Sequence, residues 1–542
     1  GIIADVIDEE GFKTDPSAWL RPQNEHFVVV TRLLYAANVL LTGGHNLGLT
    51  LFTWLAAAAQ AIILSMNLPG RDLSPTVDRL YFPLVAGVFI FTPLSWHNWI
   101  LGMSGTAWIS TNLFVVSAIA SLTAAKTLRS AGWFRASLGF ALVATLTYST
   151  GLAVWPALII GAFVLRLGPN RIGTLMLAGG FAILSYLFLY QRPSDHPALE
   201  TDLFRVVEYL LTLLGSTLTG DAAVAPAAGA FGLLLSIFLA VRVLWSGSGD
   251  RRGVSIALSL QTYSVVNALL AAIARSGFGA DQAFASRYAS LPSLFWLGLF
   301  AAAALSLPPA RKRTGTLLLS AIVIAILVHS YQRTDIAIGS ALERERLKPL
   351  AAAAIVTENL DLPLLQASVS PRHVEAFFRR RDTIAGLEAL GHVPYGGLFE
   401  GCPPPGSPLP VAPRSPGASQ STQWGALESA RVKGQNVHYF GGHIGDRLPP
   451  PRCILLVNQA GIVRGIGVIA GGPPGWPAQR LTPPRESPDW AGYASIRRED
   501  EWIGAVALWD DSPDTWMRLG GLAIIARGQT GEISSLELVT PD

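Results

Sequence analysis

The chain has 542 residues, of which 50% are hydrophobic and only 14% are charged, and its formal net charge at pH 7 is +3. This small positive charge does not indicate a nucleic-acid partner, because the basic residues fall in loops between apolar stretches. The sequence contains no P-loop motif, which argues against an ATP-driven function. The mean hydropathy of +0.40 agrees with a membrane protein but adds little, because it averages two unlike parts of the chain.

Long apolar stretches fill the first 330 residues and then stop. A transmembrane helix needs roughly 20 apolar residues, and seven stretches are clear candidates: Asn46 to Met66, Thr106 to Ala125, Ile172 to Tyr190, Ala222 to Trp245, Gly253 to Ala274, Leu291 to Leu307 and Thr316 to Ser330. Three shorter ones either cross with tilting or local thinning of the bilayer or pack inside the bundle: Tyr81 to Ser95, Ala136 to Thr150 and Leu152 to Leu165. We therefore expect an α-helical polytopic membrane protein with 10 to 11 spans. A further helix before Gly1 is expected in preference to a cleaved signal peptide.

Basic residues are concentrated in every second loop between these stretches. They are Arg71, Arg79, Lys126, Arg129, Arg135, Arg166, Arg171, Arg242, Arg251, Arg252, Arg311, Lys312 and Arg313. Under the positive-inside rule, loops of this kind are cytoplasmic. The alternate loops then face outward, together with residues 1–45 and all residues after 330. The sequence thus predicts a transmembrane domain at 1–330, with its first outer loop at 1–45, followed by an exterior domain.

The exterior domain is expected to have three parts. Residues 331–400 have a helical pattern, and residues 401–420 carry seven prolines and three glycines, which is typical of an irregular linker. Residues 421–542 contain short strand-like runs separated by turn residues, which indicate a β-sandwich and hence an α+β exterior domain. The expected strands are Val437 to Phe440, Cys453 to Asn458, Ile462 to Ile469, Gly492 to Ile496, Ile503 to Trp509, Gly521 to Ala526 and Ser534 to Val539.

Tryptophan and cysteine usage gives two further expectations for this domain. The only two cysteines of the chain are Cys402 and Cys453. In an oxidising compartment they form one disulfide, and two separate reduced thiols are the alternative. Dense tryptophans in a small sandwich are either core residues or exposed platforms for sugar rings; those concerned are Trp476, Trp490, Trp502, Trp509 and Trp516.

Polar clusters occur in three of the loops expected to face outward. Polar residues at the rim of a bundle are often interfacial anchors. A loop that combines carboxylates, an imidazole and an amide is harder to explain in that way. The residues concerned are Asp5, Asp8, Glu9, Asn24, Glu25, His26 and Arg32 in the first loop, His97 and Asn98 in the second, and Arg287 and Tyr288 in the third.

These motifs resemble those of bacterial membrane glycosyltransferases of the GT-C superfamily. An acidic pair, Asp8-Glu9, lies about fifteen residues before Asn24-Glu25-His26, and other similar tracts are Trp96-His97-Asn98-Trp99, Tyr148-Ser149-Thr150-Gly151, Trp155-Pro156 and Ser286-Arg287-Tyr288. The resemblance covers roughly residues 5–330. It implies a GT-C-like bundle in the bacterial cytoplasmic membrane, a polyprenyl-phosphate sugar as donor, and a catalytic acid in the first outer loop. It also implies that the soluble domain is periplasmic or extracellular.

Sugar transfer from such a donor needs a base for the acceptor hydroxyl and a cation for the leaving phosphate. We expect Asp8 to be the catalytic base, with Asp5 and Glu9 as near rivals, and Arg287 to bind the phosphate. The other expected substrate-binding residues are Asn24, Glu25, His26, Arg32, His97, Asn98 and Tyr288. Either His26 or His97 assists this transfer, or joins the carboxylates in binding a divalent cation as cofactor. A structural role for His26 is equally open.

Two other functions stay open. One is a lipid-linked sugar transporter, although coupled carriers place ionisable residues at mid-membrane depth and these spans are nearly free of them. The other is a non-enzymatic membrane subunit whose exterior domain binds a partner. The expected partners are membrane lipids, a polyprenyl-phosphate sugar and an acceptor glycan, lipid or protein, and no nucleic acid.

We predict that a reporter fused after Val539 reaches the non-cytoplasmic side, because the alternating basic loops place the tail there. An alkaline phosphatase fusion at this position should be active and a green fluorescent protein fusion dark. The same reporters inserted after Arg129 should give the reverse pattern. Fluorescence without phosphatase activity after Val539 would contradict the predicted topology.

Overall fold

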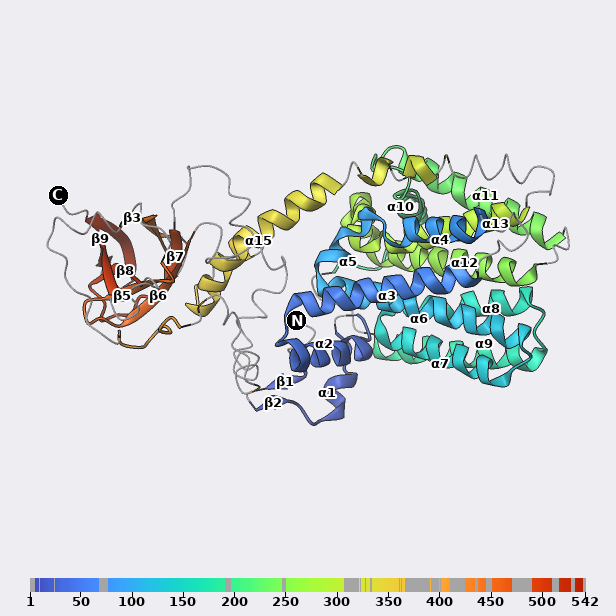
Figure 1. The fold of residues 1–542 in the computed structure, drawn as a ribbon, viewed down its shortest axis with the longest axis horizontal. Coiled ribbons are helices and arrows are strands. Elements are labelled where there is room, and N and C mark those ends of the chain that lie inside the picture. The colour runs from blue at the N-terminus through green and yellow to red at the C-terminus, as the bar shows by residue number, and fades with distance from the viewer. Residues whose placement is uncertain are drawn as a thin grey trace. The chain divides into compact units, whose positions relative to one another are not determined.

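The computed structural model (Figure 1) describes residues 5–8, 10–23, 25–67, 77–190, 196–245, 250–306, 321, 323–326, 328–331, 334–359, 361, 363–365, 390, 399, 401–409, 425–433, 437–444, 451–469, 490–508, 516–527 and 532–539. The chain divides into two compact units, one formed by residues 2–6 and 13–337 and the other by residues 7–12 and 338–542. The first unit is a helical bundle, and the second contains a β-sheet domain.

The bundle contains helices that match the long apolar stretches. Its helices are α1 (Pro16–Leu20), α2 (Val29–Thr42), α3 (Asn46–Asn67), α4 (Val77–Ile90), η2 (Pro93–Ser95), α5 (Trp96–Ile100), α6 (Gly102–Thr127), α7 (Ala131–Thr147), η3 (Ser149–Ala153), α8 (Val154–Val164), α9 (Pro169–Leu189), α10 (Leu203–Gly215), α11 (Ala225–Trp245), α12 (Arg251–Arg275), η4 (Ser276–Phe278), η5 (Ala280–Phe284), η6 (Ser286–Tyr288) and α13 (Ser290–Ser306). Helix α15 (Thr334–Val356) follows at the boundary between the units.

Six helical segments in the described part of the chain are long and apolar enough to cross a membrane: Asn46–Asn67, Gly102–Thr127, Pro169–Leu189, Ala225–Trp245, Arg251–Phe278 and Ser286–Ser306. They match six of the seven longest stretches and confirm that these stretches form apolar helices of membrane-spanning length. In the seventh, Thr316 to Ser330, residues 321, 323–326 and 328–330 are described and helical. The three shorter stretches are helical as α4, α7 and α8, which have 14, 17 and 11 residues.

Two helices were not expected from apolar stretches, α2 and α10. In α10 the charged residues Arg205 and Glu208 interrupt the apolar run, so that it does not read as a continuous stretch. In α2 the interruptions are Arg32 and Asn38, and both are buried. Polar residues therefore conceal both helices in the sequence: those of α2 are buried in the bundle, and those of α10 are exposed.

Helix α6 is at the centre of the bundle, where it packs against α3, α7 and α8. In the most apolar window of α6, 78% of the residues are buried, whereas the value for α9 is 11%. A helix that exposes so many apolar side chains is suited to contact with lipid. Helix α6 is thus an inner helix of the bundle, and α9 is a peripheral one.

Close helix packing in the bundle depends on small residues. Gly161 of α8 faces α12, and a Cβ atom at this position would lie 2.6 Å from the hydroxyl of Ser259. The Ser255 hydroxyl donates to the Gly161 carbonyl at 3.2 Å, and that of Ser259 donates to the Ala157 carbonyl at 2.9 Å. Small residues and interhelical hydrogen bonds of this kind are typical of membrane helices.

The second unit has one sheet of β10 (Ile533–Val539), β9 (Trp516–Arg527), β3 (Gly425–Val432), β4 (His438–Ile444), β7 (Trp490–Ala494), β6 (Val463–Ile469), β5 (Cys453–Asn458) and β8 (Trp502–Leu508), in this spatial order. Because β8 also pairs with β9, seven strands close into a barrel-like ring and β10 extends from β9. A sandwich is therefore not confirmed. All seven expected strands are present, but β3 was missed because Gly-Ala-Leu-Glu-Ser-Ala-Arg-Val has weak strand propensity.

Trp490 is a core residue of this sheet and not a sugar platform. Its side chain is fully buried, and glycines on neighbouring strands make room for it. A Cβ atom added to Gly442 would lie 2.9 Å from the indole nitrogen, and one added to Gly467 would lie 2.9 Å from the ring. Trp502 is partly buried, with Arg518 5.1 Å from its ring centroid. Trp476 and Trp509 lie outside the described residues.

Cys402 and Cys453 are joined by a disulfide with an S–S distance of 1.99 Å. Cys453 is the first residue of β5, and Cys402 lies 51 residues earlier in the chain. The bond therefore ties the segment before the barrel to one of its strands.

We predict that Cys453→Ala makes the second unit more sensitive to proteolysis. Loss of a disulfide that closes a loop of this size typically costs about 2–5 kcal/mol. Limited proteolysis of the full-length variant beside the native protein measures the effect, with Ser429→Ala on β3 as a control. Full alkylation of both cysteines in unreduced native protein would contradict the bond itself.

Candidate functional site

Several loops at one end of the bundle converge on a tight turn in the first loop. The backbones of Gln23 and His26 bond to each other in both directions, with N–O distances of 2.8 and 2.9 Å. Glu25 lies within this turn, and its carbonyl oxygen accepts a hydrogen bond from the Tyr186 hydroxyl near the end of α9. The turn is therefore fixed both by its own hydrogen bonds and by α9.

The Glu25 side chain is the centre of a buried charge cluster. Only 6% of it is exposed, and it forms an ion pair with Arg275, the last residue of α12. His196 lies 3.4 Å from one carboxylate oxygen, and His26 lies 3.4 Å from the other. Arg275 also bonds His196 at 2.8 Å. A buried carboxylate needs such partners, because an unpaired charge away from water is costly.

His26 links this cluster to the segment between α7 and α8. Its Nδ1 atom is hydrogen-bonded to the Ser149 hydroxyl at 2.6 Å, and its ring lies 4.1 Å from that of Tyr148. Burial, together with the positive charges of His196 and Arg287, lowers the pKa of His26 to about 3. His26 is therefore neutral at pH 7, and its contact with Glu25 is not an ion pair between two charges.

A row of aromatic rings connects His26 with the third polar cluster. Tyr148 lies 5.1 Å from Trp108 of α6, and Trp108 lies 5.2 Å from Tyr288, between ring centroids. The guanidinium of Arg287 lies 4.8 Å from the Tyr288 ring centroid and donates to its hydroxyl at 3.3 Å. Arg287 and Glu25 thus belong to the same end of the bundle.

The second polar cluster packs beside Arg287. The buried side-chain amide of Asn98 donates to the Arg287 carbonyl at 3.1 Å, and its oxygen accepts from the Ser104 hydroxyl at 2.6 Å. The backbone N–H of His97 lies 3.4 Å from the Ser286 hydroxyl. These bonds position the segment that carries Arg287. The side chain of Asn98 therefore stabilises the backbone at Arg287 in this structure.

The acidic residues of the first loop have different partners and belong to different structural units. Asp5 forms an ion pair with the fully buried Arg32 at 3.0 Å, and Arg32 also donates to the carbonyls of Trp19 and Arg21. Asp8 ends the two-residue strand β1 (Ile7–Asp8), which pairs with β2 (Gly11–Phe12). Asp8 therefore belongs to the second unit, whereas Asp5 belongs to the bundle.

Two predicted site residues, Glu9 and Asn24, lie outside the described residues. Two residues of the cluster, His196 and Arg275, were missed in the sequence. His196 lies in the loop before α10, and Arg275 is the last residue of α12. Other arginines, such as Arg32 and Arg287, also lie on the side predicted to face outward, so the basic-residue pattern alone does not identify Arg275.

Among the residues that the structure describes, no group of three or more His, Cys, Asp or Glu side chains is arranged to hold a metal ion. In the Glu25 cluster the guanidinium of Arg275 takes the position of the cation.

No protein-family model matches this chain, and no curated protein or solved structure matches it either. The arguments about its function therefore depend on the geometry of its own residues.

We predict that Glu25→Gln lowers the stability of the bundle by about 3 kcal/mol, because it removes the buried carboxylate that pairs with the partly buried Arg275. Thermal unfolding in detergent, followed by circular dichroism, should show a lower Tm than for the native protein. Glu208→Gln is the matched control, since Glu208 is exposed on α10. Equal Tm values for the two variants would show that the cluster does not stabilise the bundle.

Proposed function

We propose that this protein transfers a sugar from a polyprenyl-phosphate donor to a glycan, lipid or protein acceptor at the outer face of a bacterial cytoplasmic membrane. The tail of such a donor stays in the bilayer, so its sugar phosphate lies where membrane-length helices end. The observation that carries the proposal is the position of Arg287 at one end of the bundle. Arg275 there pairs with Glu25 and Arg32 pairs with Asp5, whereas Arg287 has no carboxylate partner among the described residues, and His26 is neutral.

Arg287 is the proposed binding partner of the donor phosphate. Arg275 is engaged by Glu25, and Arg32 is engaged by Asp5. Within the described part of the chain, Arg287 bonds a tyrosine hydroxyl and has no carboxylate partner. A guanidinium without a carboxylate partner can bind two phosphate oxygens at once and stabilise the negative charge of the leaving group.

Asp8 is the proposed general base. The carboxylates of Asp5 and Glu25 are committed to guanidinium groups, which makes them poor proton acceptors. Asp8 instead accepts a backbone hydrogen bond from Glu10 at 3.1 Å and has no basic partner among the described residues. In this proposal the bundle is GT-C-like with 10 to 11 spans, and the β-sheet domain is periplasmic or extracellular.

We predict that native protein incubated with a panel of polyprenyl-phosphate sugars releases polyprenyl phosphate. Arg287→Gln should lower kcat by roughly 10²-fold, since it removes a preorganised donor to the leaving group. Asp8→Asn should lower the rate by roughly 10²–10⁴-fold, the range of general acid–base catalysis. Lipid phosphate is quantified by chromatography of the extracted lipids.

The control variant is Arg205→Gln, because Arg205 is 63% exposed on α10 and pairs with Glu200. Its rate should equal that of the native protein. The mechanism would be wrong if a variant lacking the Asp5, Asp8 and Glu9 carboxylates kept full activity. Absence of lipid phosphate release from every donor by the native protein would overturn the proposed function.

A further inference from the structure

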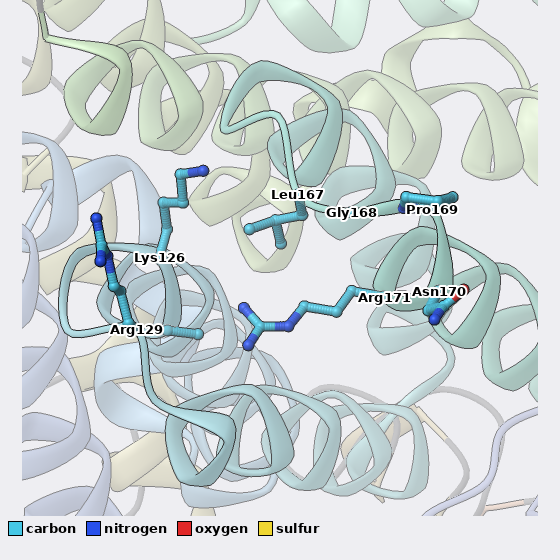
Figure 2. A pocket seen from close by; sticks show the side chains of 8 residues that line it. Lys126, Arg129, Leu167, Gly168, Pro169, Asn170 and Arg171 are labelled. Carbon is cyan, nitrogen blue, oxygen red and sulfur yellow. The ribbon is translucent and has the colours of Figure 1, made fainter.

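A hollow of about 370 Å³ lies between the last turn of α6 and the first turn of α9. Its lining residues are Ala125, Lys126, Arg129, Leu167, Gly168, Pro169, Asn170 and Arg171. Three of these eight side chains are cationic and none is a carboxylate. Figure 2 shows the guanidinium of Arg171 extending from α9 toward the side of the hollow formed by Lys126 and Arg129. The hollow therefore has a cationic lining, which favours an anionic ligand.

The positive charges in the hollow are not neutralised within the described part of the chain. Lys126 donates to the Arg166 carbonyl at 3.4 Å, and the guanidinium of Arg171 lies 5.4 Å from the ring centroid of Phe134. Neither they nor Arg129 form an ion pair with a described carboxylate. The start of α9 adds positive potential, because Gly168 provides no side-chain cap for the helix N-terminus.

An apolar face of α9 continues from the hollow. Helical periodicity places Asn170, which lines the hollow, on the same face as residues one turn or more along the helix. On that face the apolar side chains are largely exposed, with Leu177 at 78%, Phe181 at 75%, Leu184 at 67% and Phe188 at 89%. A cationic hollow at the end of an exposed apolar stripe matches a molecule with a charged head and an apolar tail.

The hollow is distinct from the Glu25 cluster. Helix α9 contributes Arg171 to the hollow and Tyr186 to the cluster. Fifteen residues of helix separate these two positions, which corresponds to about 22 Å along the axis. The charged group bound in the hollow thus lies away from the Glu25 cluster.

We propose that this hollow binds the phosphate headgroup of an anionic membrane lipid, with its acyl chains along the exposed face of α9. The phosphate is held by the guanidinium groups of Arg129 and Arg171, which can each bind two of its oxygens, while Lys126 adds charge. The apolar stripe favours a lipid over a free phosphate ion, because a free ion leaves that stripe without a partner. This inference is independent of the proposed catalytic function.

The experiment uses full-length protein in a neutral detergent, titrated with phosphatidylglycerol or phosphatidylcholine of equal chain length. Native mass spectrometry counts the lipids retained by each protein molecule. The native protein should retain phosphatidylglycerol in preference, and the double variant R129Q/R171Q should bind it on the order of tenfold more weakly, given the contribution of each basic residue near a membrane surface. Binding of phosphatidylcholine should not change.

The matched control is R135Q/R251Q, which removes two exposed arginines that do not line the hollow. It should retain phosphatidylglycerol as the native protein does. Equal losses in the two double variants would show diffuse charge attraction and overturn the site. Equal retention of the two lipids by native protein would overturn it without any variant. Displacement of phosphatidylglycerol by millimolar inorganic phosphate would show that the site takes the free ion, contrary to the proposal.

Discussion

The arrangement of the bundle end depends on the need to neutralise one buried carboxylate, that of Glu25. Its side chain is 6% exposed, and its charged partner Arg275 lies 250 residues later in the chain. A carboxylate in such a place is tolerated only with a close cation and further hydrogen bonds. Satisfying this requirement brings the first loop, the loop before α10 and the end of α12 together. The same turn is tied to α9 through Tyr186 and to the start of η3 through Ser149.

The two ends of the bundle have different electrostatic character as a result. At the Glu25 end, acidic and basic side chains pair with one another and lie among aromatic rings. Arg287 also lies at this end and has no carboxylate partner among the described residues. At the other end, Lys126, Arg129 and Arg171 line a hollow that has no acid. Between the two ends the helices are apolar and pack through small residues. This separation of charge suits a protein whose middle contacts lipid.

The first loop contributes to both structural units. Asp5 neutralises Arg32, which in turn holds the carbonyls around α1 and anchors the start of α2 in the bundle. A few residues later the chain enters the short β1–β2 hairpin, which carries Asp8 and belongs to the second unit. Acids that are neighbours in sequence therefore have different environments. The second unit has its own core around Trp490, as a domain that folds around a separate sheet requires.

The sequence by itself determined the helical membrane class, because a continuous apolar stretch of about 20 residues has few other solutions. It also determined most strands of the second unit, since their β-branched and aromatic runs are separated by turn residues. Helix α2 was hidden by polar residues such as Arg32, whose burial depends on partners elsewhere in the chain, and helix α10 was hidden by the exposed charged residues Arg205 and Glu208. Closure of the sheet into a barrel was decided by the pairing of β8 with β9, a long-range contact that alternation along single strands does not encode. The sequence likewise identified Glu25 and His26 as candidate site residues. Their partners His196 and Arg275 were decided by the tertiary structure, because electrostatic pairing depends on distance in space and not along the chain.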